Sequence, residues 1–343
     1  MKLAVIAFTR KGGGLNSKIV NELMLTGEQV TGYMIDKYVD DTNLTPFCNL
    51  KDLMKNLFST MDGIIFIGAC GIAVRSIAPY LRSKVEDPAV LVLDEHGTYV
   101  ISLLSGHIGG GNELTNIVAN MIGGKPVITT ATDVNQKFAV DSWAKKNKLI
   151  ITDVSMIKLI SSSILHGEKI SFFSELKMAG QLPSELTKDK TDIGICISND
   201  KNRKPYPNTL NLIPKNIVLG IGCKRETPFD RIETFVDEVL KENQIDSKRV
   251  IKICSIDLKS KESGMIQLAE KFGVRFNTFS VEELNAVKGE FASSSFVKNT
   301  VGVDNVCERS AMLGSEYGSL IIPKTSKQGI TLAVCEINHI LQF

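Results

Sequence analysis

The sequence predicts an α/β protein built on largely parallel sheets. Short aliphatic runs without polar alternation, such as residues 3–8 (LAVIAF) and 89–93 (AVLVL), are typical of strands buried on both faces. Between such runs lie stretches with apolar residues at three- and four-residue steps, for example residues 229–242, as expected for amphipathic helices. Regular alternation of the two patterns indicates α/β architecture.

The same two patterns recur along the whole chain. The predicted strands are residues 3–8, 63–69, 89–93, 126–130, 217–221, 250–253 and 319–322, with a further strand-like run at 100–104. The clearest predicted helices are residues 16–25, 112–121 and 229–242. The lone tryptophan, Trp143, is expected in a core or an interface.

The composition is that of an ordinary globular protein. With 343 residues, 43% of them hydrophobic, the chain is expected to form two or three domains. A net charge of +2 gives no strong field toward nucleic acid or a membrane, so an anionic ligand must be held locally. The 7 cysteines include no CxxC pair, and no apolar run approaches the roughly 18 residues of a membrane span. These features predict reduced thiols and a cytoplasmic location.

The pattern changes between about residues 145 and 215. Lysine, serine and proline are frequent there, and the prolines of KPYP and IPKN oppose a continued helix. We therefore expect an N-terminal α/β domain over residues 1–144, and a middle region ending in an exposed linker over 145–215. A separate α/β domain is expected over 216–343.

The segment from Asp87 to Asn112 concentrates acid–base chemistry. Asp94, Glu95 and His96 follow one predicted strand, and SGHIGGGN follows the next. His107 in that block titrates near neutrality when unperturbed and lies among glycines that allow a ligand to approach. These residues can supply a general base and donors for an acyl transition state. The alternative is that they cap turns.

Other glycine-rich or polar turns follow predicted strands. Residues 9–16 (TRKGGGLN) form either an anion-binding turn or a flexible one. Arg75 is a candidate carboxylate clamp, since open α/β sheets bind ligands where their strands end. The hydroxyls after residues 126–130 either bind carboxylates or cap a helix. In LGIGCKRETP, Arg225 replaces the third glycine of a dinucleotide fingerprint, so an anion site is favoured over a nucleotide site.

Taken together, these blocks resemble the CbiG family of cobalamin biosynthesis. The matching segments are GIAVRSIAPYLRSKVEDPAVLVLDEHGTYVISLLSGHIGGGNELTN, PVITTATD, LGIGCKRETP, CSIDLKSKESG and SSFVKNTVGVDNVCERSA, in the family's order. The resemblance implies an N-terminal CbiG domain, a poorly patterned middle region and a CobE-like C-terminal domain. It also implies a cobalt-precorrin-5A hydrolase, which opens the ring A lactone with water and releases acetaldehyde to give cobalt-precorrin-5B.

The roles expected for this reaction follow from the residues in those blocks. His107 is expected to be the general base, oriented by Glu95 or Asp94, with the amides of Gly109 and Gly110 receiving the oxyanion. The residues expected to contact the substrate are Arg75, Lys84, Ser105, Gly109, Gly110, Asn112, Thr130, Thr132, Asp133, Lys224 and Arg225. No cofactor or metal of the protein's own is expected, because cobalt arrives in the tetrapyrrole. A homodimer or transient contact with other enzymes of the pathway is a further expectation.

Two other functions compete with the hydrolase. A non-catalytic tetrapyrrole carrier would use the same glycine turns and basic residues for binding alone. A methyltransferase or nucleotide-dependent transferase is disfavoured, because no complete phosphate-binding or dinucleotide motif is present.

Overall fold

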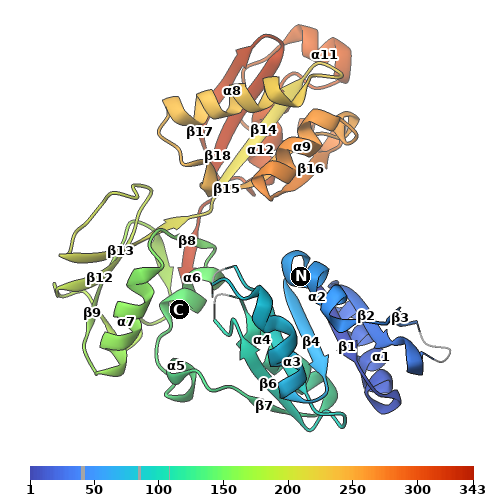
Figure 1. Cartoon of the computed structure of the whole chain (residues 1–343). Helices are drawn as coiled ribbons and strands as arrows, with labels where there is room; N and C mark the ends of the chain where they lie inside the picture. The colour runs from blue at the N-terminus through green and yellow to red at the C-terminus, as the bar shows by residue number, and fades with distance from the viewer. Residues whose placement is uncertain (40–42, 84–85, 108) are drawn as a thin grey trace. The chain divides into compact units, whose positions relative to one another are not determined.

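The computed structural model describes residues 1–39, 43–83, 86–107 and 109–343. The chain divides into two compact units. The first comprises Met1–Trp143 and Ser161–Glu168, and the second comprises Ala144–Ile160 and Lys169–Phe343. Each unit contains parallel β-sheet with helices (Figure 1), which confirms the predicted α/β class.

The first unit is built on a doubly wound sheet with strand order β3-β2-β1-β4-β5-β6-β7. All neighbours are parallel except β5 and β6, which run antiparallel. The strands are β1 (Lys2–Ala7), β2 (Gln29–Ile35), β3 (Thr45–Phe47), β4 (Gly63–Ile67), β5 (Ala89–Leu93), β6 (Tyr99–Leu104) and β7 (Lys125–Val127). The α-helices are α1 (Arg10–Leu25), α2 (Leu50–Thr60), α3 (Cys70–Ile77), α4 (Gly111–Ile122), α5 (Ala131–Val134) and α6 (Val140–Lys146), which crosses into the second unit. Two short 3-10 helices are η1 (Asp36–Tyr38) and η2 (Ala78–Tyr80).

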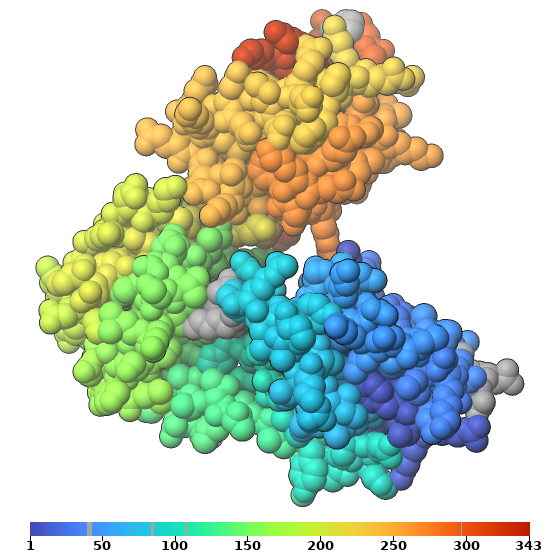
Figure 2. Space-filling view, viewed as in Figure 1, coloured from blue at the N-terminus to red at the C-terminus, as the bar shows by residue number. Residues whose placement is uncertain are grey.

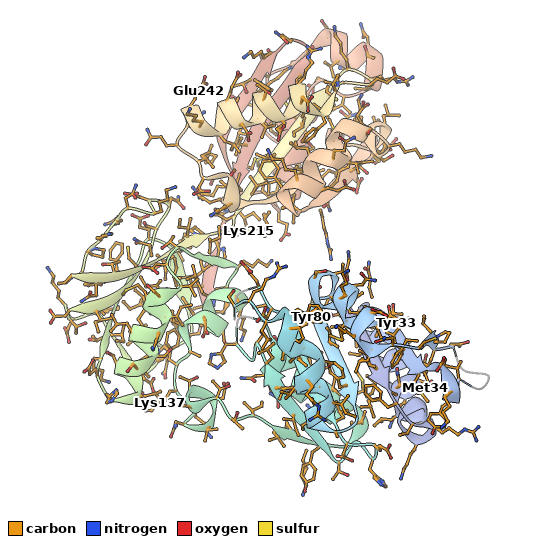
Figure 3. All side chains as sticks on the ribbon, in the orientation of Figure 1. Tyr33, Met34, Tyr80, Lys137, Lys215 and Glu242 are labelled. Atoms are coloured by element: carbon orange, nitrogen blue, oxygen red, sulfur yellow. The ribbon has the colours of Figure 1, made fainter. Side chains whose placement is uncertain are left out.

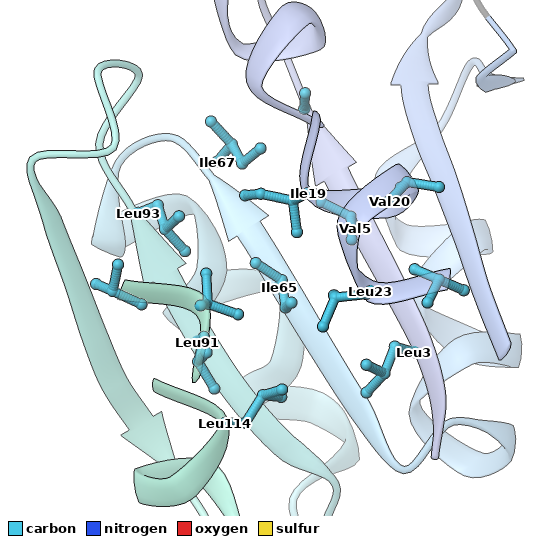
Figure 4. Packing of buried hydrophobic residues seen from close by; sticks show 14 of the residues in the cluster. Leu3, Val5, Ile19, Val20, Leu23, Ile65, Ile67, Leu91, Leu93 and Leu114 are labelled. Carbon is cyan, nitrogen blue, oxygen red and sulfur yellow. The ribbon is translucent and has the colours of Figure 1, made fainter. Parts of the chain in front are cut away.

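Both faces of this sheet are buried, which explains the uninterrupted apolar strands. On one face, α1 and α4 pack against alternate residues of β1, β4 and β5 (Figure 4). On the other face, α2 and α3 cover the remaining strand residues. Tyr33 and Met34, labelled in Figure 3, are neighbours on β2 and contribute to opposite faces. Each fully buried Leu or Ile contributes about 1.5–3 kcal/mol.

Helix α1 begins earlier than predicted and contains the three consecutive glycines. Thr9 caps it, since the amide of Gly12 donates to the Thr9 hydroxyl at 3.1 Å. A Cβ on Gly13 would lie 3.0 Å from the Met34 side chain, so this helix packs closely on the sheet. The segment is therefore a helix start, not a flexible turn.

The middle region forms a sheet of its own in the second unit. Its strand order is β11-β9-β12-β13-β8, with β8 antiparallel to β13. The elements are β8 (Leu149–Ile151), α7 (Ser155–Leu165), β9 (Ile170–Ser174), β10 (Lys177–Ala179), β11 (Leu186–Thr187), β12 (Ile193–Ile197) and β13 (Asn208–Pro214). The exposed linker expected before residue 215 is wrong in part, because residues 210–214 are a buried strand. Proline is tolerated at the end of that strand, where it excludes helix but not sheet.

The C-terminal α/β domain follows after Lys215 and Asn216 (Lys215 is labelled in Figure 3). Its sheet has the order β16-β15-β14-β18-β17, with β14, β15 and β16 parallel and β17 and β18 antiparallel. The elements are β14 (Ile217–Cys223), α8 (Phe229–Glu242), η3 (Ser247–Arg249), β15 (Val250–Ile256), η4 (Asp257–Lys259), α9 (Ser263–Phe272), β16 (Arg275–Phe279), α10 (Val281–Ala286), α11 (Ser295–Val301), α12 (Val306–Gly314), β17 (Ser319–Lys327) and β18 (Ile330–Glu336).

Helices α8 and α9 cover one face of this sheet and lie in front of it in Figure 1, and the yellow and orange atoms of this region form the surface seen in Figure 2. Helix α12 packs on the sheet so closely that a Cβ on Gly220 would lie 1.9 Å from the Cys307 carbonyl oxygen. After β18 the chain returns to the middle region, where β19 (Ile340–Gln342) pairs in parallel with β10.

Candidate active site

His107 lies between two carboxylates in the first unit. It follows β6, which precedes α4, while Asp133 belongs to α5 and Asp141 to the first turn of α6. Its Nε2 atom is 2.6 Å from Oδ2 of Asp133, and its Nδ1 atom is 3.2 Å from Oδ2 of Asp141. The exposed fractions of these side chains are 15% for His107, 38% for Asp133 and 5% for Asp141. The site is therefore open to solvent on the Asp133 side.

This environment changes the protonation of the histidine. The hydrogen bond with Asp141 is the largest influence on the His107 pKa; burial opposes it, while the charge of Asp141 and the contact with Asp133 reinforce it. The net effect raises the pKa of His107 to about 9. Burial also tends to raise the pKa of Asp141, but the hydrogen bond and charge of His107 outweigh it and lower that pKa. At neutral pH this arrangement favours an imidazolium flanked by carboxylates, which can donate a proton, whereas the base role expected for His107 requires the neutral ring.

Asn112, at the start of α4, fixes the orientation of Asp133. Its Nδ2 donates to Oδ2 of Asp133 at 2.9 Å and to Oγ1 of Thr130 at 3.2 Å. Its Oδ1 accepts from Ser102 Oγ at 2.7 Å, which fixes the amide orientation. The Thr132 hydroxyl lies 3.3 Å from Nε2 of His107. The structure thus brings together five of the expected residues: His107, Asn112, Thr130, Thr132 and Asp133.

Asp141 and Ser102 complete this network, and the sequence did not single them out. Asp141 lies 34 positions from His107 and comes just before Trp143, which is buried with 8% exposure. An acidic residue in the first turn of a helix is common, because it stabilises the positive end of the helix dipole. Because an acidic residue at this position is common, no local sequence pattern distinguishes Asp141 as a site residue.

The expected orientation of His107 by Asp94 or Glu95 requires correction. These residues connect β5 to β6, which pair antiparallel with Leu93 opposite Val100 and Val90 opposite Leu104. The connection therefore lies at one end of the strand pair, and the loop carrying His107 lies at the other. The Asp94 carboxylate instead accepts the amides of His96 at 2.9 Å and Tyr99 at 2.7 Å. Burial tends to raise the pKa of Asp94, but these amides lower it.

The glycines around His107 serve the turn itself. A Cβ on Gly109 would lie 2.4 Å from the Cβ of Ser105, and one on Gly106 would lie 2.5 Å from Oδ1 of Asn112. The amide of Gly110 donates to the His107 carbonyl at 2.9 Å, so the expected oxyanion donor at Gly110 is already engaged. Within the described ranges, the buried hydroxyl of Ser105 has no hydrogen-bond partner.

The remaining expected substrate contacts lie elsewhere. Arg75 is exposed on α3, and its guanidinium folds back to within 3.3 Å of the Cβ position of Gly71. It therefore lies near the carboxyl end of β4, beside which the parallel strand β5 ends and leads into the Asp94 turn. Lys224 and Arg225 are exposed in the second unit, directly after β14. Lys84 lies outside the described residues.

Neither a membrane helix nor a metal cluster is present in the described part of the chain. Over residues 1–39, 43–83, 86–107 and 109–343, no helix has the length and apolarity needed to cross a membrane. Across those ranges, no group of three or more His, Cys, Asp or Glu side chains is arranged to hold a metal ion.

The fold and the site define a multidomain α/β protein with a histidine–carboxylate cluster beyond the carboxyl ends of β6 and β7. Family profiles match each part of the chain. They are described as Cobalamin synthesis G N-terminal (residues 52–133), Cobalamin biosynthesis central region (138–214) and Cobalamin synthesis G C-terminus (217–335).

Two relatives of the same name match most of the chain. A protein of Salmonella typhimurium named "Cobalt-precorrin-5A hydrolase" is 38% identical over 294 residues, which is 82% of this chain and 83% of that protein. A protein of the same name from Priestia megaterium is 32% identical over 360 residues, covering 98% of this chain and 95% of the other. The crystal structure of CobE, from the cobalamin (vitamin B12) biosynthetic pathway, is 22% identical with a TM-score of 0.34, covering 35% of this chain and 89% of that one. The chain belongs to the CbiG family of cobalamin biosynthesis.

Proposed function

We propose that this protein is a cobalt-precorrin-5A hydrolase whose acid–base centre is formed by His107, Asp133 and Asp141. The observation that carries the activity is the 38% identity, over 82% of the chain, to a protein of that name. The reaction consumes one water and converts cobalt-precorrin-5A to cobalt-precorrin-5B and acetaldehyde. Lactone hydrolysis forms a carboxylate and frees an alcohol on the extruded carbon. That alcohol then loses its proton, and the bond between the extruded carbon and the ring breaks to give acetaldehyde. The electron pair of the broken bond passes to the macrocycle.

The protonation of the site suggests a division of roles between its two exposed groups. Asp133 is the more exposed partner, and in the described structure its Oδ1 accepts no hydrogen bond, so it is open to a water molecule. In the proposed mechanism this carboxylate accepts a proton from the attacking water. The His107 imidazolium stabilises the developing oxyanion and then protonates the leaving alkoxide. Positioned acid–base groups of this kind each contribute about a hundredfold to ten-thousandfold to rate.

Asp141 and Asn112 act as positioning residues in this scheme. The nearly buried Asp141 holds the imidazolium in its charged form, and Asn112 holds the Asp133 carboxylate toward it. The amide of Gly109 is retained as an oxyanion donor, with Ser105, Thr130 and Thr132 as nearby substrate contacts. Arg75 lies at the opposite end of the sheet from His107, so its expected role as a carboxylate clamp has no part in this mechanism.

The proposal needs no cofactor, because the cobalt enters as part of the substrate. It places the reaction in the cytoplasm. A homodimer, or transient contact with other enzymes of the pathway, is a further part of the proposal. Contact with the neighbouring enzymes would shorten the path of the tetrapyrrole from one enzyme to the next.

The test compares two histidine-to-alanine variants at opposite ends of the β5–β6 pair. His107→Ala should abolish acetaldehyde release, measured by coupling to alcohol dehydrogenase, while binding of the cobalt tetrapyrrole persists. His96→Ala is the matched control and should retain turnover within about twofold. Near-normal turnover of His107→Ala would remove His107 from the mechanism. Binding without acetaldehyde release by the wild-type protein would favour a carrier.

A further inference from the structure

The C-terminal α/β domain contains a cavity of about 750 Å³. It opens where β14 and β15 end, which is the edge at which open α/β sheets bind their ligands. Its walls are completed by α11, the start of α12 and the β17–β18 hairpin. This size falls within the usual range of small-molecule sites, about 300–1,000 Å³.

The lining combines an apolar floor with a cationic rim. Apolar and thiol side chains come from Cys223, Ile256, Val297, Val306, Cys307 and Ile330. The cationic side chains are Lys224, Arg225, Lys259 and Lys324. Within the described part of the chain, no acidic residue lines the cavity. Lys259 is paired with Glu262 at 2.7 Å. The ammonium groups of Lys224 and Lys324 form no ion pair with an acidic side chain among the described residues, so both are available to an anionic ligand at the mouth.

A single buried carboxylate ties three walls of this cavity together. Glu308 is 2% exposed, and its Oε2 accepts the amide of Ala292 at 2.9 Å and Nδ2 of Asn305 at 2.5 Å. Its Oε1 accepts the amide of Lys324 at 2.7 Å. Burying a carboxylate is costly unless its oxygens are hydrogen-bonded, and here three donors bind them.

The third of these bonds positions a cationic side chain. The pairing of β17 with β18 is irregular between Ile322 and Thr325, so Lys324 lies in a bulge of an edge strand. Bulges redirect side chains next to functional sites. Because Glu308 holds the bulge from inside, the half-buried Lys324 side chain is directed to the cavity wall.

We propose that this cavity is a second ligand site, which binds an amphipathic polycarboxylate: one edge of the cobalt tetrapyrrole with its acidic side chains. The identity of the ligand rests on the proposed function. The ring edge would lie on the apolar floor, and its carboxylates would reach Lys224, Arg225 and Lys324. An uncharged ring of the same size would gain only the floor contacts.

The test measures binding to the full chain by absorbance titration at low salt. The probe is cobyrinic acid, a cobalt corrin whose side chains end in carboxylates, and the comparison probe is cobinamide, the same ring with amidated side chains. Lys324→Ala and Arg225→Ala should each weaken binding of cobyrinic acid by about tenfold, as expected for loss of one charged hydrogen bond. Neither should change cobinamide binding. Lys241→Ala, an exposed lysine on α8 outside the cavity, is the matched control.

A second variant tests the cavity by volume. Val297→Trp should weaken binding of both probes by filling the floor, and circular dichroism and the thermal midpoint verify that it folds. If Lys324→Ala, Arg225→Ala and a folded Val297→Trp all bind cobyrinic acid like Lys241→Ala, the inference is overturned. Loss of binding in His107→Ala alone would also overturn it. Because no turnover is measured, a wild-type protein that releases no acetaldehyde would sink the proposed function and leave this result intact.

Discussion

Nε2 of His107 lies 2.6 Å from Oδ2 of Asp133, and the other nitrogen of the same ring faces Asp141. An ionised carboxylate only accepts hydrogen bonds, so both ring nitrogens must donate. The same two contacts raise the pKa of His107 to about 9, so the ring is expected to be an imidazolium at neutral pH.

The first prediction concerns stability against pH. The pKa of His107 rises from 6.5 to about 9 on folding, so its contribution is fully present below pH 6.5 and is lost as pH rises through about 9. The loss should be on the order of 3 kcal/mol. It can be measured as the free energy of unfolding in urea between pH 6 and 10. His107→Gln should flatten this dependence, whereas His166→Gln, at an exposed position, should not. An unchanged slope in His107→Gln would contradict the assignment.

The second prediction concerns the Asp141 carboxylate. Asp141→Asn removes the largest influence that raises the His107 pKa, so that pKa should fall toward its ordinary value. NMR titration of the His107 ring reports this directly. If His107 acts as an acid, the basic limb of the kcat profile should move to lower pH by the same amount. A fixed basic limb, despite a shifted ring titration, would exclude that role. Asp52→Asn, at an exposed position on α2, controls for the loss of a charge.

The third prediction separates positioning from binding. Asn112→Ala frees the Asp133 carboxylate from its amide donor and leaves the Ser102 hydroxyl without its acceptor. Misplacement of a catalytic group by about 1 Å costs up to about a hundredfold in rate. The expected result is a lower kcat with KM changed less than threefold. Asn116→Ala, one turn along the exposed side of the same helix, should behave as wild type. Equal kinetics for the two variants would contradict the positioning role.

The fourth prediction compares two glycines. A Cβ on Gly14, exposed within α1, meets nothing within 4 Å, so Gly14→Ala should stabilise the protein by about 0.5–1 kcal/mol. A Cβ on Gly220 would lie 1.9 Å from the Cys307 carbonyl oxygen, so Gly220→Ala should destabilise it by about 1–3 kcal/mol or more. Urea unfolding midpoints measure both. Similar midpoints would show that α12 can move away from its sheet at little cost.

The fifth prediction concerns Glu308. Glu308→Ala removes the acceptor of the Ala292 and Lys324 amides, whose hydrogen bonds are only partly buried, and one of the two acceptors of the buried Asn305 side chain. An unmet buried donor costs about 1–3 kcal/mol, so the C-terminal α/β domain should lose about 1–3 kcal/mol of unfolding free energy. Glu308→Gln should lose less, because its oxygen still accepts. Glu242→Ala, exposed at the end of α8 and labelled in Figure 3, is the control. A Glu308→Ala protein as stable as this control would refute the account.

The sequence predicted strands best where burial on both faces leaves an uninterrupted apolar run. Residues 89–93 are predicted and observed as a strand with the same bounds. The linker expected before Lys215 was wrong in part, because Leu210 and Leu212 are separated by a polar residue and flanked by prolines. Such a pattern resembles a loop until neighbouring strands bury it.

The sequence predicted site residues correctly only where residues near one another in the chain, or at the ends of adjacent parallel strands, also lie together in space. His107, Asn112 and Asp133 lie on loops and helices that follow β6 and β7, which are parallel and adjacent, so their carboxyl ends meet. Asp94 and Glu95 are closer to His107 in sequence than Asp133 is. They nevertheless lie at the opposite end of the sheet, because β5 and β6 are antiparallel. Only the strand directions distinguish the two cases, and they cannot be obtained from residue types.

The pairing of β10 with β19 can form only after the last strand has been synthesised. The amide of Gln342 donates to Oδ1 of Asn147 at 2.7 Å, and its carbonyl accepts from Nδ2 of Asn147 at 3.0 Å, although the two residues are 195 positions apart. At a synthesis rate of about 5–20 residues per second, roughly 10 to 40 s pass between the synthesis of Asn147 and that of Gln342. During that interval the C-terminal α/β domain leaves the ribosome, while β10 presents an unpaired edge to any strand nearby. A chaperone that covers this edge would reduce its pairing with other strands, and slower translation would increase it. Neither would alter a residue of the active site.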